Sequence, residues 1–295
     1  MTQEAPEPGA ADPLSLRGVV PPTVTAFRDD ESLDADATAA HARFVVDRGA
    51  TGVFPLGTNG EFPLVTADER ERVVECVVDE VGDEVPVIAG VGAPSTRETV
   101  ASARAAADAG VDGVVVVTPF YYPLDDRAAV GHYRCVVEAV DLPTYVYHIP
   151  SKTGNALSLS ALSDLAEAGV AGVKDSSKDV PWLGQAIDAH PEMTFLAGSD
   201  SLLFPGLEVG CAGMVSAVAN AFPELVVDLY EAYDEGDEER ARELQSEVYD
   251  VRSALKRGPY MAGVKTALGL RDLGFDPGPL RSPLTEMAEI GRAHV

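Results

Sequence analysis

A single lysine, Lys174, interrupts the small and apolar run AGVAGVKDSSKD that spans residues 168–179. The residues before it have the pattern of a buried parallel strand, where an ammonium group is costly. Loss of hydration lowers the pKa of a buried lysine, so that the neutral amine becomes accessible. A neutral amine adds to a carbonyl carbon and forms a Schiff base, which accepts electrons from an adjacent carbon–carbon bond. We therefore interpret Lys174 as a candidate Schiff-base residue.

The spacing around Lys174 recurs in RGATGVFPLG (48–57), AGVDGVVVVTP (109–119) and VGCAGMVSAV (209–218). Each copy has Gly-x-x-Gly directly before an apolar run, and the positions equivalent to Lys174 hold Phe54, Val115 and Val215. Because these three residues are apolar, we predict that the position of Lys174 is buried. A lysine that reaches solvent from a strand end, or that pairs with Asp175, is the alternative.

The same repeats predict the fold. The first glycine of each Gly-x-x-Gly is expected to end a helix, where φ > 0 is commonly required, and the second to open a strand. Further strands are expected at 18–27, 85–93, 142–150 and 193–199, with helices between them. Eight strands that alternate with helices indicate an α/β protein built as a (β/α)8 TIM barrel. A doubly wound sheet is the alternative, but no Gly-x-Gly-x-x-Gly follows the first strand.

The domain organisation expected from this pattern has three parts. The barrel is predicted at residues 17–225. The acidic, Pro- and Ala-rich residues 1–16 are expected to form a mobile tail. Residues 226–295 are expected to form a C-terminal helical region packed on the barrel.

Catalytic groups of such a barrel gather at the C-terminal ends of its strands. Tyr147 lies near that end of the strand at 142–150, next to the strand of Lys174, and is the candidate proton shuttle; a half-buried ring with a satisfied hydroxyl is the alternative. The turn Gly57-Thr58-Asn59-Gly60 offers a hydroxyl group and backbone N–H groups to a carboxylate. The aromatic run around Tyr121 is more typical of packing or a subunit contact than of catalysis.

Charge and composition disfavour several classes of function. The 295-residue chain has 22 Lys and Arg against 48 Asp and Glu, a net charge of −26, which disfavours nucleic-acid and anionic-membrane partners. The dispersed acids and scarce lysines indicate adaptation to high salt. With no apolar run of membrane-spanning length, no signal peptide and three scattered cysteines, we expect a cytoplasmic protein with reduced thiols. Lysine occurs only at Lys152, Lys174, Lys178, Lys256 and Lys265.

Taken together, these motifs make the sequence resemble the class I, lysine-dependent pyruvate aldolases, a family that includes dihydrodipicolinate synthase, N-acetylneuraminate lyase and 2-keto-3-deoxygluconate aldolase. The resemblance covers residues 17–290. It is carried by GTNGE, TPFYYP, YHIPSKTG, GVKD and the stretch GSDSLLFPGLEVGCAGMVSAVANAFPE.

This resemblance implies a role for each matching position. The amine of Lys174 would form the imine, Tyr147 would carry protons, and Tyr121 would reach across a dimer contact into the neighbouring site. It also implies a homotetramer, a dimer of dimers. We expect no cofactor beyond the covalent imine, and no metal, because no His, Asp or Glu cluster in the sequence has ligand spacing. The expected set is Lys174, Tyr147, Tyr121 and Thr58 for catalysis, and Thr58, Asn59, Gly60, Lys152, His148 and Ser216 for substrate binding.

Two positions depart from the family pattern. His148 stands where asparagine is most common after the shuttle tyrosine. Lys152 stands where the synthases carry arginine, and lysine cannot copy the bidentate grip of arginine on a carboxylate. Lys152 could instead contact a hydroxyl or a phosphate group, or remain a solvated rim residue.

The departure at Lys152 favours an aldolase that cleaves a 2-keto-3-deoxy sugar acid, 2-keto-3-deoxygluconate or its 6-phosphate, to pyruvate and an aldehyde. The alternatives are 4-hydroxy-tetrahydrodipicolinate (dihydrodipicolinate) synthase, a 2-keto-3-deoxy acid dehydratase, and a barrel that binds a 2-oxo acid without turnover. The expected partner is this small 2-oxo acid, with neither nucleic acid nor membrane.

Overall fold

The computed structural model describes residue 14 and residues 16–287. Its strands are β1 (Gly18–Val19), β2 (Ile88–Gly90), β3 (Gly113–Val117), β4 (Thr144–His148), β5 (Gly172–Asp175), β6 (Thr194–Ala197) and β7 (Gly213–Met214). Its helices are α1 (Ala35–Val46), α2 (Ala67–Val81), α3 (Thr96–Asp108), α4 (Asp126–Val137), α5 (Pro150–Thr153), α6 (Leu159–Glu167), α7 (Val180–Ala189), α8 (Leu203–Glu208), α9 (Pro223–Asp234), α10 (Glu238–Leu255) and α11 (Tyr260–Leu270). Two 3-10 turns, Phe62–Leu64 and Val218–Asn220, complete the set. Among these helices none is long and apolar enough to cross a membrane.

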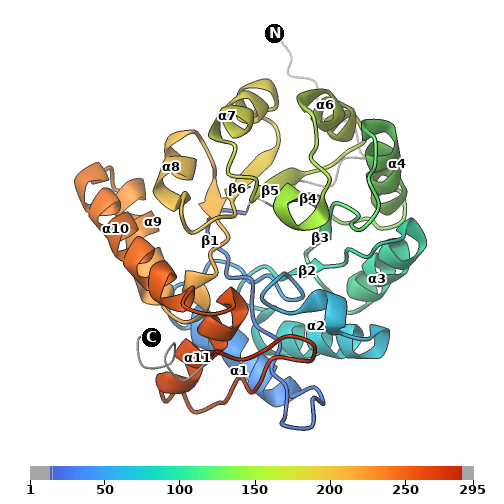
Figure 1. Ribbon diagram of the computed structural model, residues 1–295. Coiled ribbons are helices and arrows are strands. Elements are labelled where there is room, and N and C mark those ends of the chain that lie inside the picture. The colour runs from blue at the N-terminus through green and yellow to red at the C-terminus, as the bar shows by residue number, and fades with distance from the viewer. Residues whose placement is uncertain (1–13, 15, 288–295) are drawn as a thin grey trace.

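The strands form one parallel sheet in the order β1-β7-β6-β5-β4-β3-β2, which curls into a barrel inside a ring of helices (Figure 1). This confirms the predicted α/β barrel. The eighth strand, expected within 48–57, is reduced to a single parallel bridge between Val53 and Val87. Its backbone still closes the barrel, because Phe54 N donates to Pro21 O at 2.9 Å and Ile88 N donates to Val53 O at 3.0 Å. Prolines such as Pro21 and Pro55 have no N–H group, which explains why the ladder is so short here.

The predicted glycine pattern is confirmed where helices end. Gly49, Gly110, Gly169 and Gly210 have φ between 86° and 108°. The last three directly follow the C-cap of a helix, and Gly49 lies two residues after the C-cap Asp47. A residue with a Cβ is strained in this region. The glycines therefore turn the chain from the helix layer into the next strand.

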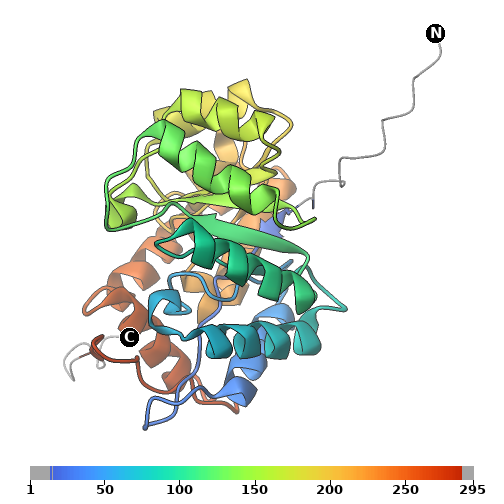
Figure 2. The ribbon, with the colours of Figure 1, turned by 90° about the vertical axis from the view of Figure 1, so that its right-hand side faces the viewer.

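The helices after residue 222 extend the barrel. The helix α9 packs against β1, and α10 lies outside α9 (Figure 1). The segments that follow α10 gather at one end of the barrel (Figure 2). The boundary predicted between residues 225 and 226 lies inside α9.

Most of the predicted tail, residues 1–13 and 15, lies outside the described residues, as do residues 288–295. The described part of the tail is packed. Leu16 is 2% exposed, and the carbonyl of Leu14 accepts a hydrogen bond from Tyr145 Oη.

A buried ion pair joins the C-terminal extension to the barrel. Lys265 Nζ, on α11, lies 2.9 Å from Glu61 Oε1, and both side chains are at most 4% exposed. Glu61 directly follows the Gly57–Gly60 turn, and its other oxygen accepts from Arg281 N at 2.9 Å. The pair therefore fixes the turn predicted to hold a carboxylate.

Replacing Lys265 by methionine leaves the Glu61 carboxylate buried without its cation. We expect this K265M variant to lose about 3–5 kcal/mol of unfolding free energy. The additional E61Q substitution should restore part of the loss, because no lone charge then remains buried. Urea denaturation at constant KCl concentration measures both effects, and a loss below about 1 kcal/mol for K265M would contradict the assigned role.

Candidate functional site

Lys174 and Tyr147 contact each other across the β4–β5 pair. They are register partners, and their side chains are buried, with exposed fractions of 4% and 6%. The amine Nζ of Lys174 lies 3.5 Å from the centroid of the Tyr147 ring and donates to Ser176 Oγ at 2.9 Å. Ser176 Oγ donates to the carbonyl of Gly198 at 2.7 Å, which leaves its lone pairs for the amine. The amine and the phenol singled out from the sequence are thus brought together.

Burial and mutual contact change the pKa of both groups. Burial lowers the pKa of Lys174. The nearby Tyr147, Asp175 and Asp200 raise this pKa, but less than burial lowers it. Burial raises the pKa of Tyr147, but the charge of Lys174 and hydrogen bonds with Thr58, Lys174 and Ser176 lower it by more, so the pKa of Tyr147 is lowered. The neutral amine of Lys174 is therefore more accessible than in a free lysine, and the phenolate of Tyr147 is more accessible while Lys174 carries its charge.

Thr58 and Asn59 lie in the same cavity as this pair. The cavity has a volume of about 180 Å³ and is lined by Tyr147, Lys174 and Ser176 together with both turn residues. Thr58 Oγ1 lies 3.1 Å from the hydroxyl oxygen of Tyr147. A hydroxyl and an amide beside the amine fit the carboxylate of a 2-oxo acid whose keto carbon faces Lys174.

Gly60 does not line this cavity. It shapes the turn instead, since a Cβ at this position would lie 3.0 Å from the backbone nitrogen of Leu56. Gly60 thus has a steric role in the turn, and its predicted contact with substrate stays a prediction.

Four cationic side chains line the cavity: Lys152, Lys178, Arg252 and Lys256. Lys178 follows β5, whereas Arg252 and Lys256 lie one turn apart at the end of α10. Burial, followed by the charges of Arg252 and Lys178, lowers the pKa of Lys256, as expected for three neighbouring cations. We call Lys178, Arg252 and Lys256 the cation cluster.

The cations of the cavity have no carboxylate partners within the described part of the chain. No salt bridge among residues 16–287 includes Lys152 or a member of the cation cluster. In a chain with net charge −26, these cations are concentrated in one cavity, where the Asp200 carboxylate raises the pKa of Lys256 without forming a salt bridge with it.

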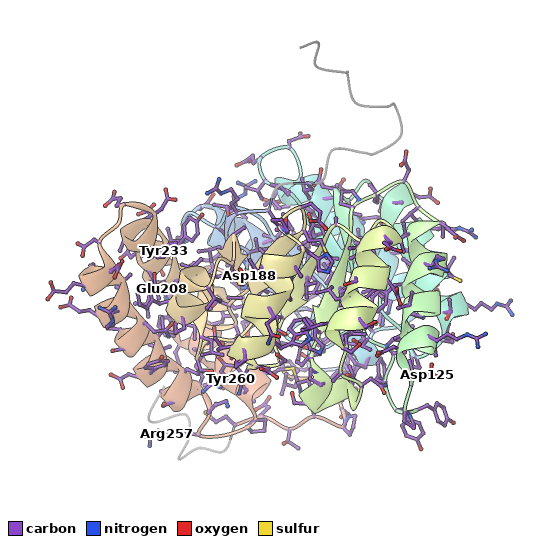
Figure 3. All side chains as sticks on the ribbon, turned by 90° about the horizontal axis from the view of Figure 1, so that it is seen from above. Asp125, Asp188, Glu208, Tyr233, Arg257 and Tyr260 are labelled. Atoms are coloured by element: carbon purple, nitrogen blue, oxygen red, sulfur yellow. The ribbon has the colours of Figure 1, made fainter. Side chains whose placement is uncertain are left out.

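Ser216 lies behind the cavity rather than in it. Its Oγ donates to Asp200 Oδ1 at 2.6 Å, and Tyr260 Oη donates to Asp200 Oδ2 at 2.6 Å. Asp200 and Tyr260 line the cavity, and Tyr260 lies toward the same edge of the barrel as Asp125, the N-cap of α4 (Figure 3). Ser216 therefore orients Asp200, and its predicted contact with substrate stays a prediction.

His148 and Tyr121 do not line the cavity either. The His148 ring packs against Trp182 of α7, with 4.5 Å between ring centroids, so it points into the helix layer. The predicted contact between His148 and substrate thus has no support from the position of the ring and stays a prediction. Tyr121 is 85% exposed, and its φ is 80°. Its action in a neighbouring chain stays a prediction.

Sequence reasoning missed Ser176, Asp200 and the cation cluster. A lone serine or aspartate in a loop has no distinguishing pattern. The cation cluster did leave a signal: of the five lysines, Lys152, Lys174, Lys178 and Lys256 line this one cavity.

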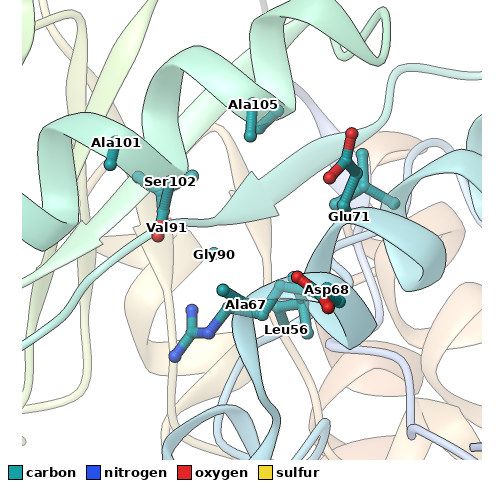
Figure 4. Close-up of a pocket in the computed structure, with 12 residues that line it drawn as sticks. Leu56, Ala67, Asp68, Glu71, Gly90, Val91, Ala101, Ser102 and Ala105 are labelled. Carbon is teal, nitrogen blue, oxygen red and sulfur yellow. The ribbon is translucent and has the colours of Figure 1, made fainter.

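Two other cavities lack the lysine and tyrosine pair that could form and use an imine. One, of about 150 Å³, lies between α2 and α3 and is lined by Asp68, Glu71 and Ser102 among small residues (Figure 4). The other, of about 290 Å³, is largely apolar and adjoins the Lys174 cavity at Thr58, Ile149 and Lys152. Neither contains Lys174.

Comparison with known proteins agrees with this geometry. Residues 15–295 match the model of the dihydrodipicolinate synthetase family. The chain is similar to a DapA-like lyase of Halobacterium salinarum, with 75% identity over 99% of this chain and 96% of the relative. It is also similar to the 4-hydroxy-tetrahydrodipicolinate synthase of Methanopyrus kandleri, with 38% identity over 94% and 93%. The crystal structure of dihydrodipicolinate synthase from Aquifex aeolicus superposes with a TM-score of 0.90 and 31% identity, over 94% and 95%.

The pH dependence of imine formation tests the state of the buried amine. A lowered pKa means that Lys174 loses its proton below the ordinary value of 10.5, so trapping by borohydride with pyruvate should reach half its maximal rate below pH 10.5. Because Tyr147 raises the pKa of Lys174, the midpoint in Y147F should lie lower still. Peptide mass spectrometry locates the adduct, and K174R should give none. A wild-type midpoint at or above pH 10.5 would exclude an activated amine.

Proposed function

The chain belongs to the dihydrodipicolinate synthetase family, and within it we propose that the protein is a Schiff-base aldolase for a 2-keto-3-deoxy sugar acid with a terminal phosphate. Its substrate would be 2-keto-3-deoxygluconate 6-phosphate, cleaved to pyruvate and a phosphorylated aldehyde. The observation that carries this proposal is the position of the unpaired cation cluster in the cavity of Lys174.

The reaction begins at the keto carbon of the substrate. The lone pair of Lys174 Nζ adds to this carbon, and loss of water gives a protonated imine. Thr58 and Asn59 would hold the adjacent carboxylate. No separate electron sink is required, since the imine itself accepts the electrons of the next step.

Tyr147 then moves the proton that carbon–carbon cleavage requires. The phenolate removes the proton of the C4 hydroxyl, the electrons of that O–H bond form the second C–O bond of the aldehyde, and the C3–C4 bond electrons move into the imine to give the enamine. Protonation at C3 and hydrolysis of the imine release pyruvate and return the amine of Lys174. The hydroxyl of Thr58, 3.1 Å from the phenol, is placed to relay the proton.

The cation cluster matches the far end of such a substrate. A phosphate group carries about −1.5 to −2 charges at neutral pH and is bound well by several point charges. The cluster shares the cavity with the amine, so one elongated substrate can contact both.

The second candidate is 4-hydroxy-tetrahydrodipicolinate synthase, which is the name of relatives that are 33–38% identical to this chain. Its semialdehyde substrate also carries an anion. The name of the 75% identical relative, a DapA-like lyase, does not separate the two candidates. The arginine of the synthases is Lys152 here, and this departure favours the aldolase.

Steady-state kinetics with paired substrates tests the proposal. Wild-type protein should prefer 2-keto-3-deoxygluconate 6-phosphate over the unphosphorylated acid in kcat/KM. Each of K178A and R252A should reduce this preference about 10- to 100-fold, because a charged hydrogen bond to phosphate is lost. R240A, a matched removal of an arginine nearer the start of α10 that lies outside the cavity, should keep the preference. Condensation of pyruvate with aspartate semialdehyde, without cleavage of either sugar acid, would establish the synthase. Loss of water from the sugar acid without release of pyruvate would establish a dehydratase. No turnover of any substrate would establish a binding protein.

We also propose a tetramer that needs high salt. The exposed Tyr121–Tyr122 pair, with rings 5.0 Å apart, supports a subunit contact, and the net charge of −26 opposes assembly unless it is screened. Light scattering should give four chains at 2 M KCl and smaller or unfolded species at about 0.1 M, where the Debye length reaches ~10 Å. A folded monomer at both salt concentrations would contradict the tetramer and its need for high salt.

A further inference from the structure

A buried histidine–aspartate pair lies directly behind the Lys174–Tyr147 pair. His148 and Asp175 are the next register partners along β4 and β5, and they are 2% and 5% exposed. Side chains alternate along a strand, so these two point away from the barrel interior that holds Lys174. The Nδ1 atom of His148 lies 2.9 Å from Asp175 Oδ1. The mechanism above makes no use of this pair.

The contacts of His148 define its tautomer. Its Nε2 atom accepts a hydrogen bond from the backbone N–H of Leu157 at 3.2 Å, so Nε2 has no proton. The ring proton is therefore on Nδ1 and is donated to Asp175. Both ring nitrogens are engaged, which leaves the imidazole no free position for substrate or proton transfer.

Asp175 organises the loop that carries Lys178. Its carboxylate accepts from the backbone N–H of Ser177 at 3.2 Å and from Ser177 Oγ at 3.0 Å. Ser177 Oγ accepts in turn from Asp179 N at 3.0 Å. Between these anchors Lys178 has φ 69°, a conformation that a residue with a Cβ keeps only where its surroundings enforce it. The aspartate thus directs a member of the cation cluster into the cavity.

His148 also closes the loop that carries Lys152. The hydrogen bond from Leu157 joins positions nine residues apart, and α5, which contains Lys152, lies between them. One imidazole ring therefore pins both loops that bring cations to the cavity.

We propose that His148 is a positioning residue that, by pinning the Lys178 and Lys152 loops, sets the preference of the site for a substrate with a distal anion. This rests on the proposed function. Removal of the ring should loosen both loops while Lys174 and Tyr147 remain on the strands β5 and β4.

The test compares H148L with H148N. Asparagine places a donor near the position of Nδ1 and can keep the bond to Asp175, whereas leucine cannot. We expect H148L to reduce the kcat/KM preference for the 6-phosphate about tenfold, mainly through KM, since small displacements of a binding group are costly. H148N should retain the preference within about threefold. S177A, a small change in the Lys178 loop, should move the preference in the same direction as H148L.

Hydrogen exchange supplies a readout that needs no substrate. Peptides covering 150–157 and 175–179 should exchange faster in H148L than in wild type, while in H148N the 175–179 peptide should stay close to wild type. If wild-type protein cleaves neither sugar acid, the proposed function fails, and exchange alone decides the positioning role. An unchanged preference in an active H148L, or unchanged exchange in both peptides, would overturn the proposal.

Discussion

The site depends on an amine that is removed from water and held against an aromatic face. Lys174 and Tyr147 are neighbours because β4 and β5 pair in parallel register, and neither side chain can leave without unpacking a strand. Burial of a lysine is costly, and that cost appears as a lowered pKa rather than as a buried charge. Gly198 makes the arrangement possible, because a Cβ there would lie 2.8 Å from the amine nitrogen.

The barrel and its C-terminal extension contribute different parts of the cavity. The strands hold Lys174 and Tyr147, and the turn after Val53 holds Thr58 and Asn59, which we propose to bind the carboxylate. The extension supplies Arg252 and Lys256. Gln245, on α10, fixes this helix to the barrel by donating to Asp200 O at 3.0 Å and accepting from Phe204 N at 2.9 Å. The chemistry and the proposed choice of substrate are thus carried by separate segments, a common division of roles in this fold.

Much of this could be predicted from the sequence because backbone constraints repeat. Gly49, Gly110 and Gly169 share a positive φ, and their spacing identified both the barrel and the odd position of Lys174. The short eighth strand was not predicted. Apolar residues such as Val53 and Phe54 have the pattern of a full strand, but the nearby prolines have no backbone N–H group to donate to a neighbouring strand. The hydrogen-bond partners of His148 and Ser216 could not be predicted, because a motif gives the position of a residue along a strand and not the partner of each polar atom. The scarcity of lysine pointed to Lys178 and Lys256, but the place of Arg252 beside them could not be predicted, because it depends on how α10 folds back onto the barrel.

The most direct measurement is a crystal structure of the protein with pyruvate. A covalent imine predicts continuous density from Lys174 Nζ to the keto carbon, with the carboxylate at Thr58 and Asn59 and the phenol of Tyr147 beside the new bond. Pyruvate bound elsewhere, or in the cavity with an unmodified Lys174, would contradict the account.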